Sequence, residues 1–135
     1  INGDKFKNNP FFTQNILEHL SLYKAGKIHL LPRADVITVT KHMNNNILLQ
    51  HTVNNEYNYS FLEHMFMGFP IIHNFSCFKD YAYYYEGNNL DSAVAAVEDA
   101  LQNHIARKEI YKAQSEQLTW RFSPYNSENQ KAWFQ

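Results

Sequence analysis

The stretch from Asn54 to Asn74 constrains the fold more than any other part of the chain. It opens with a polar loop rich in Asn and Tyr, and the capping-box spacing of Ser60 and Glu63 predicts a helix that begins near Ser60. Gly68 stands where a helix needs a left-handed residue to end. A buried strand is predicted from Pro70 to His73, because proline cannot continue the helix and two isoleucines follow it.

Short apolar segments alternate with segments of helical periodicity along the whole chain. Helices are expected at 10–25, 60–68, 90–104, 107–119 and 124–135, and strands at 27–31, 47–50, 70–73 and 83–85. Residues 35–40 are left open between a strand, which their β-branched side chains favour, and a short helix. The alternation predicts one α/β domain over residues 1–135, with a Rossmann-like parallel sheet and helices on both faces.

Two of the expected helices carry apolar stripes at helical spacing. In the helix at 10–25 the stripe comprises Phe12, Ile16, Leu17, Leu20 and Tyr23, and in the helix at 90–104 it comprises Val94, Val97, Leu101 and Ile105. Pro10 suits the first turn of the former helix, and Gly26 suits its end. Either Asn89 or Asp91 can cap the latter.

The composition argues against several classes of function. The formal net charge is −1, so no basic footprint for nucleic acid is present. Only four glycines occur, which argues against a Walker-type or dinucleotide-type phosphate loop. The seven histidines form no His-Glu-x-x-His or Cys-His pattern, so no metal ion is expected. Aromatic residues make up 16% of the chain, and the nine tyrosines suit a wet cleft or an interface.

The cysteine content and the absence of targeting segments indicate the cellular compartment of the protein. Cys77 is the single cysteine, which excludes an internal disulfide and fits a reducing compartment. No apolar run approaches the roughly 20 residues of a membrane helix, and no signal peptide is evident, so we expect a cytoplasmic protein. The chain begins at Ile1 rather than Met, and we therefore expect a fragment or a processed form.

Parallel α/β sheets bind their ligands at the carboxyl ends of the strands. The loops after Gln50 and after Ile72 would lie on this edge, next to the positive N-terminal end of the helix at 60–68. The residues that this placement gathers near one crevice are Asn55, Glu56, Tyr57, Asn58, His73 and Asn74. The sequence therefore predicts an anion-binding site there.

The segment Leu62–Ile72, Leu-Glu-His-Met-Phe-Met-Gly-Phe-Pro-Ile-Ile, resembles a motif of retaining glycosyltransferases with the two-domain GT-B fold. The motif is L-E-A-M-A-x-G-x-P-V-I, and family four of the sugar-nucleotide transferases is the closest fit. The resemblance implies the C-terminal, donor-binding half of such an enzyme, with Glu63 on the ribose hydroxyls. The family's upstream catalytic glutamate, eight positions earlier, falls on Asn55, and Glu56 follows it. Two glycines of the family's loop are replaced by Glu56 and Asn58.

The same resemblance implies further contacts with the donor. The donor-binding residues that it suggests are Lys7, Tyr57, Asn58, Tyr59, Ser60, Glu63 and His73. Lys7 would neutralise the diphosphate, and Lys5 competes for that role. The run from His73 to Tyr85 is similar to glycosyltransferases encoded by large DNA viruses of algae. The implied activity is metal-independent and retaining, with GDP-mannose as the favoured donor, an N-terminal domain of the same enzyme as partner, and a glycan or protein as acceptor.

Other interpretations stay open. Glu63 would also be explained by a capping box alone, and His73 by a hydrogen-bonded structural role. A non-enzymatic, flavodoxin-like interaction module would explain the tyrosine content and the missing glycines. A nucleotide-sugar epimerase of GT-B fold shares the expected architecture.

Overall fold

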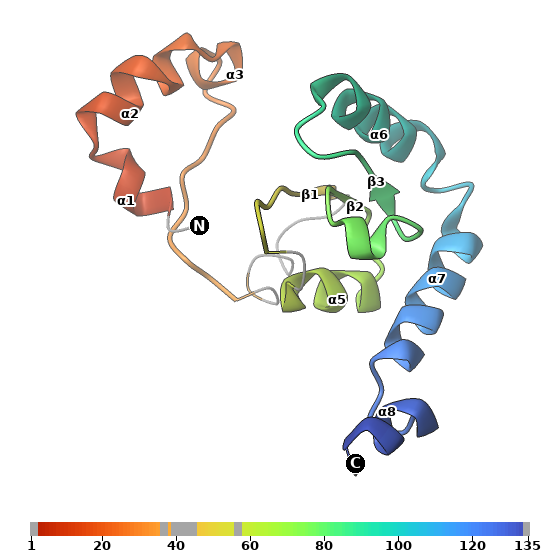
Figure 1. The fold of residues 1–135 in the computed structure, drawn as a ribbon. Coiled ribbons are helices and arrows are strands. Elements are labelled where there is room, and N and C mark those ends of the chain that lie inside the picture. Colours follow the sequence, from red (N-terminus) through yellow and green to blue (C-terminus); the bar gives the residue numbers. More distant parts are fainter. Residues whose placement is uncertain (1–2, 36–37, 39–45, 56–57, 134–135) are drawn as a thin grey trace. The chain divides into compact units, whose positions relative to one another are not determined.

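The structure is a computed structural model, and it describes residues 3–35, 38, 46–55 and 58–133. These residues fall into two compact units, Ile1–His42 and Met43–Gln135, which we describe one at a time (Figure 1). Residues 36–37, 39–40, 56 and 57, on which sequence-based predictions were made, lie outside the described part.

The first unit is a chain of short helical segments. They are α1 (Gly3–Lys7), α2 (Pro10–Asn15), the 3-10 turn η1 (Leu17–His19) and α3 (Ser21–Lys24). The prediction of one helix over 10–25 is therefore wrong. The backbone of Ile16 leaves the helical region (φ −125°, ψ −65°), and Leu20 is extended (φ −85°, ψ 123°). Leu17 is the only buried side chain among those described in α2, η1 and α3, so little packing is present to hold a longer helix.

Both ends of this helical stretch behave as the sequence predicts. Pro10 occupies the first turn of α2, and the side chain of Asn9 caps it by accepting a hydrogen bond from the Phe12 amide at 3.2 Å. Gly26 follows α3 with φ +67°, the left-handed conformation that glycine adopts without steric cost. Residues 27–31 were expected to form a strand, and they are irregular.

The second unit is a parallel sheet with helices on both faces. Its elements are β1 (Leu48–Gln50), α5 (Tyr59–Phe66), β2 (Ile71–His73), the 3-10 turn η2 (Ser76–Phe78), β3 (Tyr83–Tyr84), α6 (Leu90–Asn103), α7 (Lys108–Arg121) and α8 (Ser127–Trp133). The strand order is β1-β2-β3, and both pairings are parallel. The register pairs Leu48 with Ile71 and Ile72 with Tyr83. The α/β class with a parallel sheet, predicted from the sequence, is confirmed.

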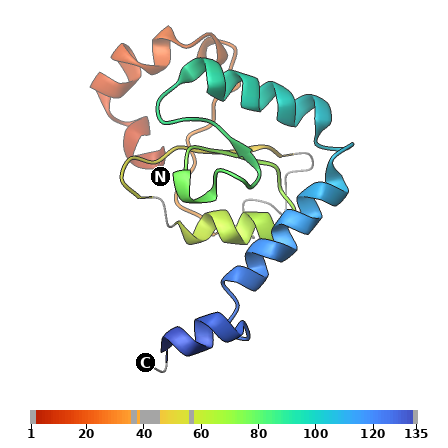
Figure 2. The ribbon, with the colours of Figure 1, turned by 45° about the vertical axis from the view of Figure 1, so that its right-hand side comes forward.

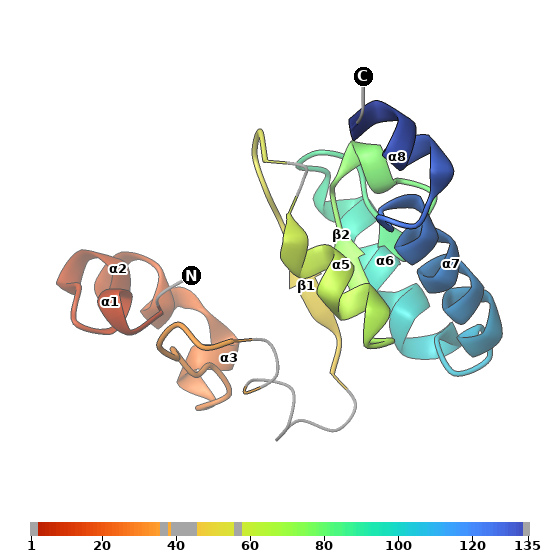
Figure 3. The ribbon, with the colours of Figure 1, turned by 90° about the horizontal axis from the view of Figure 1, so that it is seen from below.

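The helices enclose the central strand from two sides. Figure 2 shows α6 on one face of the sheet and α5 on the other, and Figure 3 shows α7 beside α5. All three residues of β2 are buried, as expected for a strand covered on both faces. Phe61 of α5 lies at the centre of the core, where its ring stacks on that of Phe78 with centroids 4.8 Å apart. The ring of Phe75 meets Phe61 edge-on at 5.5 Å.

Helix α6 packs on the sheet through small side chains. Its buried residues are Ala96 and Ala100, while Leu101 of the apolar stripe is 68% exposed. The sheet presents large side chains on this side, among them Tyr83, so alanines allow the helix to come close. Asn89 caps the helix, its side chain accepting from the Ser92 amide at 3.0 Å.

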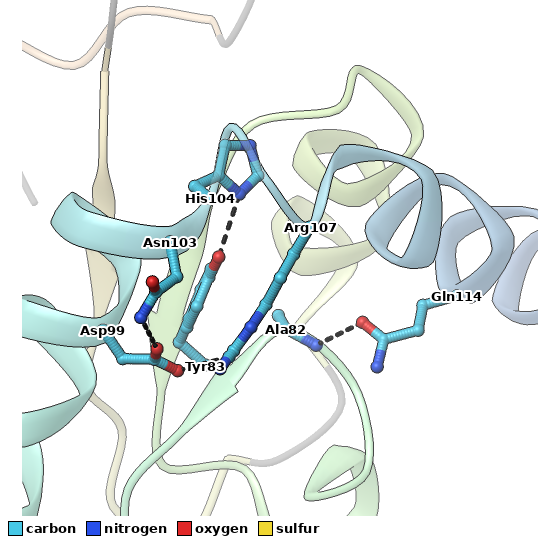
Figure 4. Close-up of polar contacts among 7 residues, drawn as sticks. All are labelled: Ala82, Tyr83, Asp99, Asn103, His104, Arg107 and Gln114. Carbon is cyan, nitrogen blue, oxygen red and sulfur yellow. Dashed lines mark hydrogen bonds and ion pairs between the residues drawn. The ribbon is translucent and has the colours of Figure 1, made fainter.

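Helix α7 is tied to the loops of the sheet by side-chain hydrogen bonds. Gln114 accepts a hydrogen bond from the Ala82 amide at 3.2 Å and donates one to the Asp80 carbonyl at 3.1 Å, and Figure 4 shows the former. These bonds hold the turn in which Ala82 has φ +56°, a conformation uncommon for a residue with a Cβ. Ser115 donates to the Met65 carbonyl at 2.8 Å and so joins α7 to α5.

Candidate functional site

The carboxyl ends of the three strands are held together by one side chain. Asn74, directly after β2, accepts a hydrogen bond from the Thr52 amide at 3.0 Å and donates to the Thr52 carbonyl at 2.8 Å. It also donates to the Gly87 carbonyl at 3.2 Å. The side-chain amide of Asn74 thus makes the same pair of hydrogen bonds with Thr52 that a backbone peptide group of a neighbouring strand would make. It also contacts the loop after β3. The prediction that the loops after Gln50 and Ile72 share an edge is confirmed.

A histidine and a tyrosine meet at the same edge. His51 follows β1 and Tyr85 follows β3, and the distance from His51 Nδ1 to the Tyr85 hydroxyl oxygen is 2.7 Å. Their rings are nearly parallel, at 13°, with centroids 6.1 Å apart. His51 is exposed and Tyr85 is buried, and burial raises the pKa of the Tyr85 hydroxyl. Sequence reasoning missed this pair, because no local spacing links two residues on different strands.

The first turn of α5 lies at this edge too. Asn58, with extended backbone, caps the helix, and its side-chain oxygen accepts from the Ser60 amide at 3.0 Å and from the Ser60 hydroxyl at 2.8 Å. The side-chain amide of Gln50, at the end of β1, donates to the Ser60 hydroxyl at 3.1 Å. The prediction that Ser60 begins the helix as a cap is therefore wrong, since Asn58 takes that position. Gly68 ends this helical segment with φ +75°, as predicted.

Glu63 stands one turn into α5 and is exposed. Because Asn58 is the cap, a capping box does not account for this carboxylate. Among the described residues, the Glu63 side chain has no hydrogen-bond or ion-pair partner. It lines a mainly apolar groove between α5 and α7, together with Leu62, Phe66, Leu118, Phe122 and Pro124. The carboxylate is thus available to a ligand at the rim of this groove.

His73 lies in the core rather than at the surface. Its side chain is 0% exposed. Nε2 donates to the Tyr81 carbonyl at 2.8 Å, and Nδ1 accepts from the Phe75 amide at 3.2 Å. Burial lowers the pKa of His73 from 6.5 to about 4, although the bond to the Tyr81 carbonyl acts in the opposite direction. This geometry favours the structural role, and a contact between His73 and the donor stays a prediction.

The remaining predicted site residues lie in different parts of the chain, and some of them lie outside the described residues. Asn55 is exposed in the loop before α5, and Tyr59, in the first turn of α5, is 83% exposed. Glu56 and Tyr57 lie outside the described residues. Lys7 is an exposed residue in the last turn of α1, in the first unit, and its role as the diphosphate-binding lysine stays a prediction.

A second cluster of polar and aromatic side chains surrounds the start of β3 (Figure 4). The Tyr83 hydroxyl lies 3.1 Å from His104 Nδ1, and the ring of Tyr111 packs edge-on against His104. Burial raises the pKa of Tyr83 and lowers that of His104. Nearby, Arg107 forms an ion pair with Asp99 at 2.6 Å. These shifts favour the neutral forms of Tyr83 and His104, so the cluster joins α6 to α7 and to the sheet as packing.

The described part of the chain contains no group of three or more His, Cys, Asp or Glu side chains arranged to hold a metal ion. No helix among the described residues is long and apolar enough to cross a membrane.

Comparison with known proteins identifies a family but no function. A family described as "Protein of unknown function (DUF2827)" matches residues 1–135. No curated protein and no solved structure matches the chain. The match covers the whole sequence, and the chain therefore belongs to the DUF2827 family.

Proposed function

We propose that the unit Met43–Gln135 is the donor-binding domain of a retaining glycosyltransferase of GT-B type. The domain would bind a nucleotide diphosphate sugar at the carboxyl edge of its sheet, and the complete enzyme would transfer the sugar to an acceptor hydroxyl. GDP-mannose is the donor that we favour. The proposal begins from the resemblance of the segment Leu62–Ile72 to the family-four motif.

The state of Glu63 is the observation that carries the proposal. Its carboxylate is exposed, lines a groove and has no partner among the described residues, while Asn58 performs the capping that would otherwise explain it. A carboxylate accepts two hydrogen bonds from the vicinal hydroxyls of a ribose. An exposed carboxylate that has no partner among the described residues is accessible for such bonds.

The position of α5 supports the same function. The helix crosses from β1 to β2, and its first turn lies beside the carboxyl end of β1, where Gln50 reaches Ser60. The Ser60 and Phe61 amides are paired with Asn58, and the positive end of the helix dipole is what makes this position favourable for a phosphate. A retaining transferase must stabilise a departing diphosphate, and fixed dipoles do so without reorganisation.

Calorimetric titration with GDP, UDP and ADP tests the proposal on the longest natural form of the protein. We expect one diphosphate to bind more tightly than the other two. We expect Glu63→Ala to weaken the binding of that diphosphate by about tenfold or more, since hydrogen bonds to a charged group are lost. Glu98→Ala, an exposed glutamate on α6, is the matched control and should bind like wild type. The proposal is overturned if none of the three diphosphates binds, or if both variants bind like wild type.

A protein-interaction module is the second candidate, and exposed aromatic side chains favour it. Phe66 is 72% exposed on α5, and Trp120 is 57% exposed on α7, where both line one groove. Tyr125, beyond α7, is 80% exposed. A folded protein that binds no nucleotide diphosphate, and in which Glu63→Ala changes nothing, would support this second candidate.

A further inference from the structure

The chemistry of Tyr85 favours one direction for its hydrogen bond with His51. Among the described residues, the only partner of the buried Tyr85 hydroxyl is His51 Nδ1, at 2.7 Å. Burial raises the pKa of this hydroxyl, so it keeps its proton. A buried hydroxyl needs an acceptor, and Nδ1 supplies it. The tautomer of His51 that accepts this bond on Nδ1 carries its proton on Nε2.

The Nε2 group of His51 is the free end of this pair. His51 is exposed, and Nε2 has no hydrogen-bond partner within the described ranges. The ring is held by its near-parallel contact with Tyr85, and the next residue, Thr52, is pinned by both atoms of the Asn74 amide. In this tautomer Nε2–H is an oriented donor that faces solvent, which is the arrangement that an acceptor ligand requires.

The pair and the first turn of α5 flank the same end of β1. The Gln50 side chain turns toward α5, where it contacts Ser60, and successive side chains of an extended chain point to opposite faces. His51 accordingly turns to the other side, toward the end of β3 and Tyr85. A ligand seated over the carboxyl end of β1 would meet the positive N-terminal end of the α5 dipole on one side and His51 Nε2 on the other.

We propose that His51, positioned by Tyr85, donates a hydrogen bond from Nε2 to a phosphate oxygen of the bound nucleotide diphosphate. This inference rests on the proposed function and names the part of the ligand that the histidine contacts. His51 is the binding residue, and Tyr85 is a positioning residue that fixes the tautomer and the ring.

Three variants of the full chain separate these roles. His51→Phe keeps an aromatic ring and removes both nitrogens, His51→Gln restores an N–H donor, and Tyr85→Phe removes only the hydroxyl. His29→Phe, the same change at an exposed histidine of the first unit, is the matched control. The probes are inorganic pyrophosphate, the preferred nucleoside diphosphate and the corresponding nucleoside, titrated by calorimetry.

We expect His51→Phe to weaken the binding of pyrophosphate and of the nucleoside diphosphate by about tenfold or more. His51→Gln should recover most of this lost affinity. Binding of the nucleoside should not change. Long-range proton–nitrogen NMR spectra should show the Nε2–H tautomer of His51 in the wild type, a mixture in Tyr85→Phe, and a shift of Nε2 on adding pyrophosphate.

The outcomes distinguish this inference from the function on which it rests. If the diphosphate binds and Glu63→Ala weakens it while His51→Phe does not, the inference is overturned and the proposed function stands. Equal losses of nucleoside and diphosphate in His51→Phe would place the histidine on the base and also overturn it. If the wild type binds neither pyrophosphate nor any nucleoside diphosphate, both fail.

Discussion

At the scale of single residues, one hydroxyl group joins α7 to the connection between α5 and β2. The Tyr111 hydroxyl donates to the Phe69 carbonyl at 2.5 Å and accepts from the Ile71 amide at 3.3 Å. Burial raises the pKa of this hydroxyl well above its usual value, so it keeps its proton and remains a donor near neutral pH. Two backbone groups at the start of the central strand depend on it.

Replacing Tyr111 by phenylalanine should lower the free energy of unfolding by about 1–3 kcal/mol, because buried backbone groups lose their partner while the ring stays. Urea denaturation measures the change. Tyr125→Phe, at a tyrosine that is 80% exposed, is the matched control and should change stability by less than about 0.5 kcal/mol. Equal stabilities of the two variants would contradict this account of Tyr111.

His73 should make stability depend on pH. Its pKa in the folded protein is about 4, against an ordinary value of 6.5. Between these values the unfolded chain binds a proton that the folded chain excludes, so stability falls as the pH is lowered from about 6.5 to about 4, by about 3 kcal/mol in total. The titration of the His73 ring in NMR spectra, which should remain neutral at pH 5, provides the direct measurement.

A variant isolates this contribution from other titrating groups. His73→Gln should show a shallower loss of stability over the same pH range, whatever its stability at pH 7. His104, whose pKa burial also lowers, contributes to the slope in both proteins and so cancels in the comparison. Parallel stability profiles for wild type and variant would show that His73 is not the source.

At the scale of elements, the start of α5 tests which residue caps the helix. Asn58→Ala should cost about 0.5–2 kcal/mol, whereas Asn58→Asp, which keeps the accepting oxygen, should cost much less. Thermal or urea unfolding of the two variants gives the comparison. If alanine and aspartate were equally harmless at position 58, the cap would lie elsewhere.

The stability of the carboxyl edge of the sheet should depend on the side-chain hydrogen bonds of Asn74. Asn74→Ala removes the bonds to Thr52 and Gly87, and we expect faster hydrogen exchange at the Thr52 amide and a loss of about 1–3 kcal/mol. Asn88→Ala, at an exposed position of the neighbouring turn, is the control. Unchanged protection of the Thr52 amide in Asn74→Ala would refute the proposed pairing.

The sequence predicted the elements of the second unit better than their contacts. The end of α5 at Gly68 was predictable because the left-handed backbone conformation that favours glycine there is a local property of the chain. The cap was not predictable, since Asn58 and Ser60 are both good caps and the backbone conformation decides between them. The pairing of Asn74 with Thr52 and of His51 with Tyr85 depends on strand register, which no local pattern contains.

Periodicity also predicted helices better than it predicted which face is buried. The stripe containing Val94 and Leu101 is regular, yet α6 packs through Ala96 and Ala100, because large side chains of the sheet already fill the space. The stripe at 10–25 did not produce one helix, since few of its side chains find a core. An apolar stripe shows which face of a helix is able to pack in a core. Whether that face is buried depends on the elements that lie next to the helix.

At the scale of the whole molecule, the core belongs to the second unit. Every member of the main hydrophobic cluster lies between Phe61 and Leu118. We therefore expect a fragment of residues 43–135 to unfold cooperatively in urea and to keep a dispersed NMR spectrum. Residues 1–42 alone, where Leu17 is the only buried apolar side chain described, should not fold. A disordered 43–135 fragment would show that the core needs the first unit.

The order of the strands has a consequence for how the protein is made. Because the sheet runs β1-β2-β3 in chain order, each strand pairs with the strand that is synthesised next to it, and no partner has to be awaited from a distant part of the sequence. The two crossovers, from Gln50 to Ile71 and from His73 to Tyr83, join strands that are neighbours in the sequence, so closing them costs less entropy than pairing strands from distant parts of the chain. The sheet can therefore assemble strand by strand as the nascent chain leaves the ribosome, and α6 and α7, which cover it, follow the last strand.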